Sequence, residues 1–242
     1  MASSNLLMQY QSESLEALKS AAKVSKPFEK VLMDTLKLFM AIPSKVNFLQ
    51  MGRYGEFSEQ TYRNNFENET FDWFAFNEHL IRKTLTGKFL SIAVDPSFLP
   101  KSLKRFIKAA VWYPDEEDRT KWQIYFSTDD AMSVKDIIDC YRTRFQLEFC
   151  FRDGTHYAGL NDCQSTDLRK LEFHRNASFA SVNIAKAACK ELGIPFSISS
   201  CKSIIHNAYM LNRFICVSGL QPDPQVIDKL FKELVLFTDR AA

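Results

Sequence analysis

The stretch 133–160, SVKDIIDCYRTRFQLEFCFRDGTHYAGL, is the part of the sequence that most limits what the chain can fold into. Apolar residues recur in it at intervals of three and four, which predicts an amphipathic helix. Ser133 followed three residues later by Asp136 is typical of a capping box at a helix start. Gly154 is expected to end the helix, because glycine is common just past a helix C-terminus.

One stripe of this helix carries Tyr141, Arg144, Glu148 and Arg152, which follow each other at helical spacing. A carboxylate between two arginines has two interpretations. It can be a solvated row of surface ion pairs, which contributes little to stability. It can also be a metal ligand beside arginines that hold the phosphate backbone of a nucleic acid. The spacing alone leaves both open.

The string Tyr141-x-x-Arg144-x-x-x-Glu148, within YRTRFQLEFCFRD, resembles the Tyr-Arg-Glu signature of bacterial insertion-sequence transposases of the DDE type. The resemblance implies an RNase H-like nuclease domain in which Glu148 is the third metal-binding acid. It also implies that Tyr141, Arg144 and Arg152 contact the DNA backbone. The family signature commonly has a lysine seven residues after the glutamate, where this chain has Thr155.

A second stretch points the same way. The apolar run Phe89–Val94, bounded by Gly87 and Pro96, predicts a buried strand that ends in Asp95. Alone, an Asp-Pro pair is a common turn. However, LSIAVDPSFLPKS also resembles the strand that carries the first catalytic aspartate in the same transposases. The resemblance therefore implies Asp95 and Glu148 as catalytic metal ligands, with Mg²⁺ or Mn²⁺ as the cofactor.

DDE chemistry needs a third acid, because three carboxylates hold two divalent ions about 4 Å apart. The interval between Asp95 and Glu148 must already hold a hairpin, predicted at Phe106–Tyr113 and Trp122–Phe126, and the start of the signature helix. A crossover alone takes a dozen or more residues, so the strand of the middle aspartate does not fit. We infer that the middle of the nuclease domain has been lost by an internal deletion. Asp129 is then the remaining candidate to replace the missing middle aspartate.

Nearer the N-terminus, the sequence suggests a helix-turn-helix. Gly52 and Gly55 mark a turn, and Ser58 is expected to cap the polar helix SEQTYRNNF. The second helix of such a motif reads base edges in the major groove, which makes Arg63 and Asn64 candidate DNA contacts. An ordinary helical bundle with a polar surface is the alternative. The transposase resemblance implies an N-terminal helical domain that binds transposon ends.

The remaining segments are expected to be helical. PFEKVLMDTLKLFMAI and FDWFAFNEHLIRKTL predict core helices, and the C-terminal helices are expected to end at Gly193, at Gly219 and further on. Residues 1–26 are expected to be a loosely ordered or helical lead-in. His174 and His206 have no acid or cysteine at ligand spacing, which predicts structural roles.

Composition narrows the class of protein. A chain with 46% hydrophobic residues and 21 Phe can build a packed core, which excludes a disordered protein. A net charge of +2 is too small for charge alone to drive nucleic-acid binding, so DNA contacts must come from local clusters. The six cysteines lack zinc spacing and are expected to be reduced. Without a signal-peptide pattern or a membrane-length apolar run, we expect a cytoplasmic protein.

We therefore expect an α/β chain: a helical domain at 1–86, an incomplete RNase H-like domain at 87–190 and a helical region at 191–242. The first expected function is a transposase, with metal-dependent DNA cleavage and strand transfer impaired by the missing aspartate. The alternative is a non-catalytic DNA-binding protein or transposition inhibitor. A third is a remnant without function, whose strand 89–94 promotes aggregation. The expected partners are transposon-end DNA and, in a homodimer, a second copy; no membrane is expected.

Overall fold

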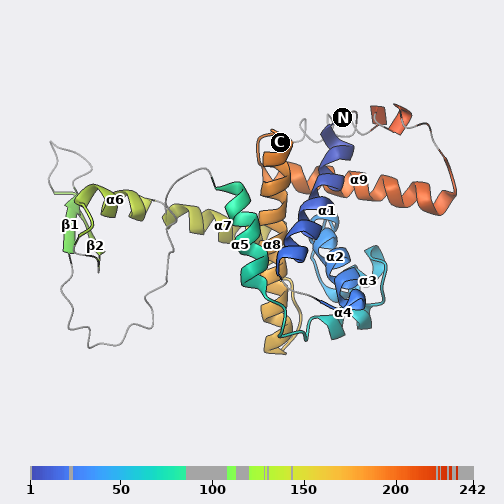
Figure 1. Ribbon diagram of the computed structural model, residues 1–242, viewed down its shortest axis with the longest axis horizontal. Helices are drawn as coiled ribbons and strands as arrows, with labels where there is room; N and C mark the ends of the chain where they lie inside the picture. The colour runs from blue at the N-terminus through green and yellow to red at the C-terminus, as the bar shows by residue number, and fades with distance from the viewer. Residues whose placement is uncertain are drawn as a thin grey trace. The chain divides into compact units, whose positions relative to one another are not determined.

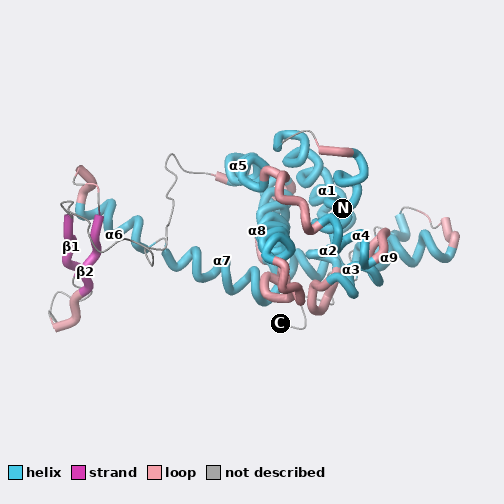
Figure 2. Tube along the Cα trace, turned by 90° about the horizontal axis from the view of Figure 1, so that it is seen from below, coloured by secondary structure: helices cyan, strands magenta, loops and turns pink. Residues whose placement is uncertain are grey.

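The computed structural model describes residues 2–21, 24–85, 108–112, 120–127, 129, 131–142, 144–221, 223, 225–227, 229–230 and 233. The chain divides into two compact units, one formed by 1–86 with 152–242 and the other by 87–151. The described residues are mostly helical and include one two-stranded sheet (Figures 1 and 2). The expected mixture of helices and sheet is present at this coarse level. The predicted strand Phe89–Val94 and Asp95 lie outside the described residues.

The first unit, here called the helical unit, joins helices from both ends of the chain. Helix α1 contacts α5, α8 and α9, and α2 also contacts α8 and α9 (Figure 1). Helices α8 and α9 share a core with the N-terminal helices. The helices are α1 (Ala2–Ala21), α2 (Lys26–Ala41), α3 (Phe48–Tyr54), α4 (Glu59–Asn65), α5 (Trp73–Thr84), α8 (Leu168–Glu191) and α9 (Ile198–Ser218).

Local signals set most of these helix ends. Ser25 caps α2 by accepting a hydrogen bond from the Phe28 amide, and α2 stops just before Pro43, as expected. Gly193 and Gly219 follow α8 and α9 with φ of 65° and 66°, a left-handed conformation that glycine adopts without strain. The predicted C-terminal ends of these two helices are therefore confirmed.

The N-terminal lead-in is a helix with a buried face. Leu6, Leu7 and Tyr10 of α1 are buried, and the Tyr10 hydroxyl donates a 2.8 Å hydrogen bond to the Leu36 carbonyl of α2. Of the two expectations for this segment, the helical one is correct and the loosely ordered one is wrong. Its apolar face packs into the core and so gains the burial that an isolated helix lacks.

The two histidines singled out in the sequence bond to the backbone. His174 is buried, and its Nε2 donates to the Gly159 carbonyl at 2.7 Å. Burial lowers the pKa of His174 and keeps its ring neutral. The Nδ1 of His206 lies 2.6 Å from the Ala41 carbonyl at the end of α2. Both contacts agree with the structural roles predicted for them.

The second unit, here called the hairpin unit, contains strands β1 (Lys108–Trp112) and β2 (Gln123–Ser127) and helix α6 (Val134–Arg142). The strands pair antiparallel with Ala110 opposite Tyr125, which confirms the predicted hairpin. These two residues form a small core with Ile137 of α6. The Asp136 amide donates to the Ser133 hydroxyl oxygen at 3.1 Å, as expected for the helix cap at Ser133, and the Ser133 hydroxyl donates to the Asp136 carboxylate at 2.6 Å.

The expected end of the signature helix is wrong. Helix α7 (Arg144–Tyr157) continues past Gly154, which is buried inside it. The chain turns instead at Gly159, whose φ is 63°. A Cβ at Gly159 would lie 2.8 Å from the Val46 side chain, so close packing as well as backbone conformation favours glycine there. None of the helices in the described part of the chain is long and apolar enough to span a membrane.

Candidate nucleic-acid interface

Helices α3 and α4 lie where the sequence suggested a helix-turn-helix. Each has 7 residues, and the turn 55–58 joins them. Asn47 caps α3 by accepting from the Gln50 amide at 3.0 Å, and Ser58 caps α4 by accepting from the Thr61 amide at 3.2 Å. The predicted helix start at Ser58 is confirmed. Two short helices joined by a glycine-containing turn of three or four residues are typical of this motif.

A buried carboxylate holds the turn and α4 in place. Asp34 of α2 accepts hydrogen bonds from the Tyr62 hydroxyl and from the Glu56 amide, the latter at 3.0 Å. The Lys37 ammonium lies 2.7 Å from the other oxygen of Asp34. A Cβ on Gly55 would lie 1.9 Å from the Tyr62 hydroxyl oxygen, so only glycine lets the turn approach this closely.

Electrostatics in this network keep Tyr62 protonated and Lys37 charged. Burial, together with the hydrogen bond to Asp34, raises the pKa of Tyr62, so the phenol stays protonated and donates. Burial acts to lower the pKa of Lys37, but the ion pairs with Asp34 and Glu56 outweigh it and the net shift is upward. The network is therefore a buried ion pair whose hydrogen bonds fix the turn.

The inner side of α4 is aromatic. Tyr62 and Phe66 are both fully buried. The Phe66 ring lies 4.9 Å from Phe48 of α3 and 4.5 Å from Phe173 of α8, measured between ring centroids. These contacts leave the polar side chains of α4 on its outer side.

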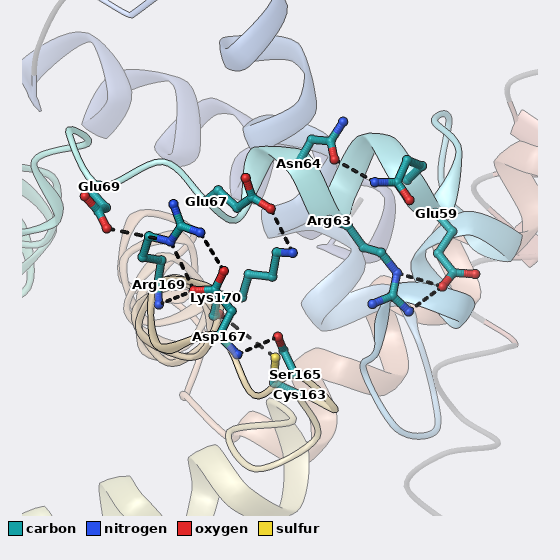
Figure 3. Close-up of polar contacts among 11 residues, drawn as sticks. Glu59, Arg63, Asn64, Glu67, Glu69, Cys163, Ser165, Asp167, Arg169 and Lys170 are labelled. Atoms are coloured by element: carbon teal, nitrogen blue, oxygen red, sulfur yellow. Dashed lines mark hydrogen bonds and ion pairs between the residues drawn. The ribbon is translucent and has the colours of Figure 1, made fainter.

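Two polar pairs lie on that outer side. The Arg63 guanidinium donates to Glu59 through Nε at 2.9 Å and Nη2 at 2.6 Å (Figure 3). It also stacks over the Phe48 ring, at 4.8 Å from the ring centroid. The Gln60 amide donates to the Asn64 amide oxygen at 2.7 Å, and both side chains are exposed. Arg63 is thus oriented before any ligand arrives, and Gln60 and Asn64 form a row of amides.

Mixed charge borders α4. Lys170 of α8 pairs with Glu67 at 2.8 Å, and Arg169 pairs with Asp167 at 2.8 Å and with Glu69 at 3.8 Å (Figure 3). The hydrogen bond from Arg169 lowers the pKa of Asp167 to about 2. Because acids balance these bases, this face attracts polyanions weakly, and any DNA contact must rest on specific hydrogen bonds as well as charge.

Helix α9 supports the element from the C-terminal part of the chain. The Tyr209 hydroxyl and the Arg213 guanidinium both donate to the Tyr54 carbonyl, and Arg213 also donates to the Arg53 carbonyl at 3.0 Å. These bonds satisfy the open carbonyl groups at the end of α3. Sequence reasoning missed this support, as it missed Asp34, because the partners are far apart in the chain.

The side chains assigned to the nuclease signature lie on α6 and α7. Tyr141 is exposed, and its ring centroid lies 4.4 Å from that of Tyr125 on β2. Glu148 is exposed on the part of α7 that belongs to the hairpin unit. Arg152 belongs to the helical unit and pairs with Asp153 at 3.1 Å. The signature residues are thus divided between the two units.

The remaining nuclease candidates complete no metal site in the described chain. Arg144 begins α7, but its side chain is outside the described residues, as is Asp95. Asp129 is exposed, and its carboxylate accepts from the Ala131 amide at 2.9 Å in a tight turn. Among the described residues, no three His, Cys, Asp or Glu side chains are grouped to hold a metal ion. We therefore derive no catalytic step through Mg²⁺ or Mn²⁺.

No protein-family model, curated protein or solved structure matches the chain. The likeness to transposases therefore rests on the sequence strings alone.

Proposed function

We propose that this protein is a DNA-binding protein of the insertion-sequence transposase type, whose α3–α4 element contacts transposon-end DNA. The observation that carries the proposal is the placement of α4, which Asp34, Tyr62 and Phe66 hold from the inside while its amide row faces outward. A rigid support matters because a recognition helix must keep its side chains in register with the base pairs.

The chemistry of the outer side fits base-edge recognition better than strong backbone binding. Asn and Gln side chains pair in two-point fashion with the N6 and N7 atoms of adenine. Gln60 and Asn64 already lie one helical turn apart and in contact. Arg63 supplies one positive charge, which Glu59 orients. We expect preference for sites that contain adenine at the contacted positions, with a shallow dependence of affinity on salt.

Fluorescence anisotropy with a labelled pool of 30-bp random duplexes, followed by selection of the tightest binders, tests the proposal. The double variant Arg63→Ala with Asn64→Ala should bind the selected duplex about tenfold or more weakly, and its salt slope should fall by about 1. Gln60→Ala should relax the sequence preference and leave the salt slope unchanged.

The chain offers a matched control. Arg82 on α5 pairs with Glu78 at 2.9 Å through Nε, as Arg63 does with Glu59 on α4. Arg82→Ala should therefore leave DNA affinity unchanged. Equal losses in Arg82→Ala and Arg63→Ala would mean that general charge, not α4, binds DNA. Unchanged affinity and salt slope in the Arg63–Asn64 double variant would overturn the proposal.

Metal-dependent cleavage and strand transfer are proposed as the parental activity, based on the RNase H-like resemblance around Asp95 and Glu148. We expect weak or no nicking of supercoiled plasmid in Mg²⁺ or Mn²⁺, because the middle aspartate has no counterpart. Nicking that disappears in Asp95→Asn, Asp129→Asn and Glu148→Gln would instead show a rebuilt active site. DNA retention on a gel without nicking would favour the non-catalytic inhibitor.

A further inference from the structure

Two cysteines in the helical unit face each other inside the core. Cys189 lies in the last turns of α8 and Cys201 in the first turn of α9. Their Sγ atoms are 3.3 Å apart, and the residues are only 1% and 2% exposed. The four other cysteines are exposed or partly exposed, so this pair stands apart in burial.

Local structure fixes both backbones. At the end of α8, the Gly193 amide donates to the Lys190 carbonyl and the Ile194 amide donates to the Cys189 carbonyl, both at 3.0 Å, which is the Schellman arrangement. At the start of α9, the Cys201 amide donates to the Ser197 carbonyl at 2.9 Å. The two thiols therefore meet across the turn between α8 and α9, and the helix ends on both sides of this turn are hydrogen-bonded.

We propose that Cys189 and Cys201 form a reversible disulfide, which makes the α8–α9 turn a modification site that locks the helical unit. The pair closes a short loop, since the two residues are 12 positions apart. A cross-link of this kind stabilises a fold chiefly by restricting the unfolded chain. Because Tyr209 and Arg213 of α9 bond to the end of α3, the disulfide also stabilises the position of the α3–α4 element.

The two thiols are chemically unequal. The hydrogen bond from the Cys189 thiol lowers the pKa of Cys201, and its place at the N-terminal end of α9 acts in the same direction. The same hydrogen bond, with burial, raises the pKa of Cys189. We assign Cys201 as the attacking thiolate, because its position in the first turn of α9 favours a negative charge, and Cys189 as the thiol that resolves the intermediate.

Hydrogen peroxide is the oxidant class that suits so buried a pair, because it is small and uncharged. The Cys201 thiolate attacks one peroxide oxygen, the O–O bond breaks, and hydroxide leaves to give a sulfenic acid. Cys189 then loses its proton to that hydroxide and attacks the Cys201 sulfur. The S–S bond forms, the S–O bond breaks, and the second oxygen leaves as hydroxide, which takes up a proton from solvent. Peroxide is thereby reduced to water and the two thiols lose two electrons.

Peptide mapping of the full wild-type chain is the direct test. After treatment with hydrogen peroxide, denaturation and alkylation with iodoacetamide, trypsin cuts after Lys186, Lys190 and Lys202. The expected product is peptide 187–190 linked to peptide 191–202, unalkylated at both cysteines and separated by dithiothreitol. Recovery of both peptides in alkylated form would overturn the proposal, as would sulfinic acid at Cys201 without the linked product.

The stabilising effect needs a background without other thiols. In the full chain carrying serine at Cys140, Cys150, Cys163 and Cys216, peroxide should raise the Tm by about 5–10 °C, and dithiothreitol should reverse the rise. Cys189→Ala and Cys201→Ala in that background should show no peroxide-dependent rise. A linked peptide without any rise in Tm would mean that the pair oxidises but does not lock the fold.

Discussion

The helical unit and the hairpin unit differ most in what their apolar side chains contact. In the helical unit, aromatic residues such as Phe66 and Phe76 are fully buried in a core to which seven helices contribute. In the hairpin unit, the buried apolar cluster consists of Ala110, Tyr125 and Ile137. The other face of the same two strands is apolar but exposed, with Phe126 65% exposed.

The two units therefore differ in how much buried apolar surface stabilises the residues that the structure describes. In the part of the hairpin unit that the structure describes, two strands and one helix bury a small apolar cluster, and a two-stranded sheet depends on such packing for its stability. The helical unit buries a wide core and also satisfies buried charges such as Asp34 with partners. Function that needs a rigid frame is therefore better placed in the helical unit, which is where α4 lies. Four experiments test this contrast.

Matched phenylalanine truncations should give the largest difference. Phe66→Ala removes a fully buried ring that packs against Phe48 and Phe173, and we expect it to lower the free energy of unfolding by about 3–5 kcal/mol. Phe126→Ala removes an exposed ring of the hairpin unit and should cost less than about 0.5 kcal/mol. Urea unfolding followed by circular dichroism measures both. Equal costs would remove the contrast between the units.

Matched aspartate substitutions should give the second-largest difference in stability between the two units. Asp34→Ala leaves the Tyr62 hydroxyl and the Glu56 amide without their acceptor and leaves Lys37 paired with Glu56 alone, at a cost of about 3 kcal/mol. Asp34→Asn keeps an acceptor for Tyr62 and should lose less. Asp129→Ala breaks one exposed turn and should cost less than about 1 kcal/mol. Thermal unfolding of the three variants gives the order; an Asp34→Ala protein as stable as Asp129→Ala would contradict it.

Alkaline pH should strengthen the helical unit through Lys202. Burial lowers the pKa of this lysine from 10.5 to about 8, while the unfolded chain keeps the ordinary value. Between pH 8 and pH 10.5 the unfolded state binds more protons than the folded state, so the free energy of unfolding rises with pH. Below pH 8 Lys202 is charged in both states, and the cost of burying its charge is then fully present. We expect Lys202 alone to contribute a gain of about 2 kcal/mol between pH 8 and 10.5, measured as the difference between the wild type and Lys202→Met, because groups with raised pKa values such as Tyr62 act in the opposite direction. Urea unfolding of Lys202→Met should lack that gain, and Lys135→Met in the hairpin unit should keep it.

Acid should weaken the helical unit through His174, with the smallest effect of the four. The folded-state pKa is lowered by burial, so the unfolded state binds more protons as pH falls through about 6.5, and stability is lost there. His174→Gln keeps a donor for the Gly159 carbonyl but cannot titrate, so its stability should change less with pH. The range 87–151 contains no histidine. Hydrogen exchange at pH 7 and pH 5, corrected for intrinsic rates, should therefore show the loss in the helical unit.

The sequence predicted the local elements well where short-range chemistry decides them. The caps at Ser58 and Ser133 and the glycines after α8 and α9 each involve residues within one turn of a helix. The Glu59–Arg63 pair is of the same kind, because residues four apart lie on one face of a helix. Gly154 failed as a helix end because its packing inside α7 outweighed the local preference.

The sequence by itself determined where helices and strands form, since caps, turns and apolar periodicity act within a few residues. Only the tertiary structure decided that the two ends of the chain share one core, that Asp34 holds the turn before α4, and that Cys189 meets Cys201. Each of these contacts joins side chains on different helices. Such pairing depends on which helix faces pack together. The hydrophobic effect is not directional, so the pattern of apolar residues along the sequence does not show which faces meet.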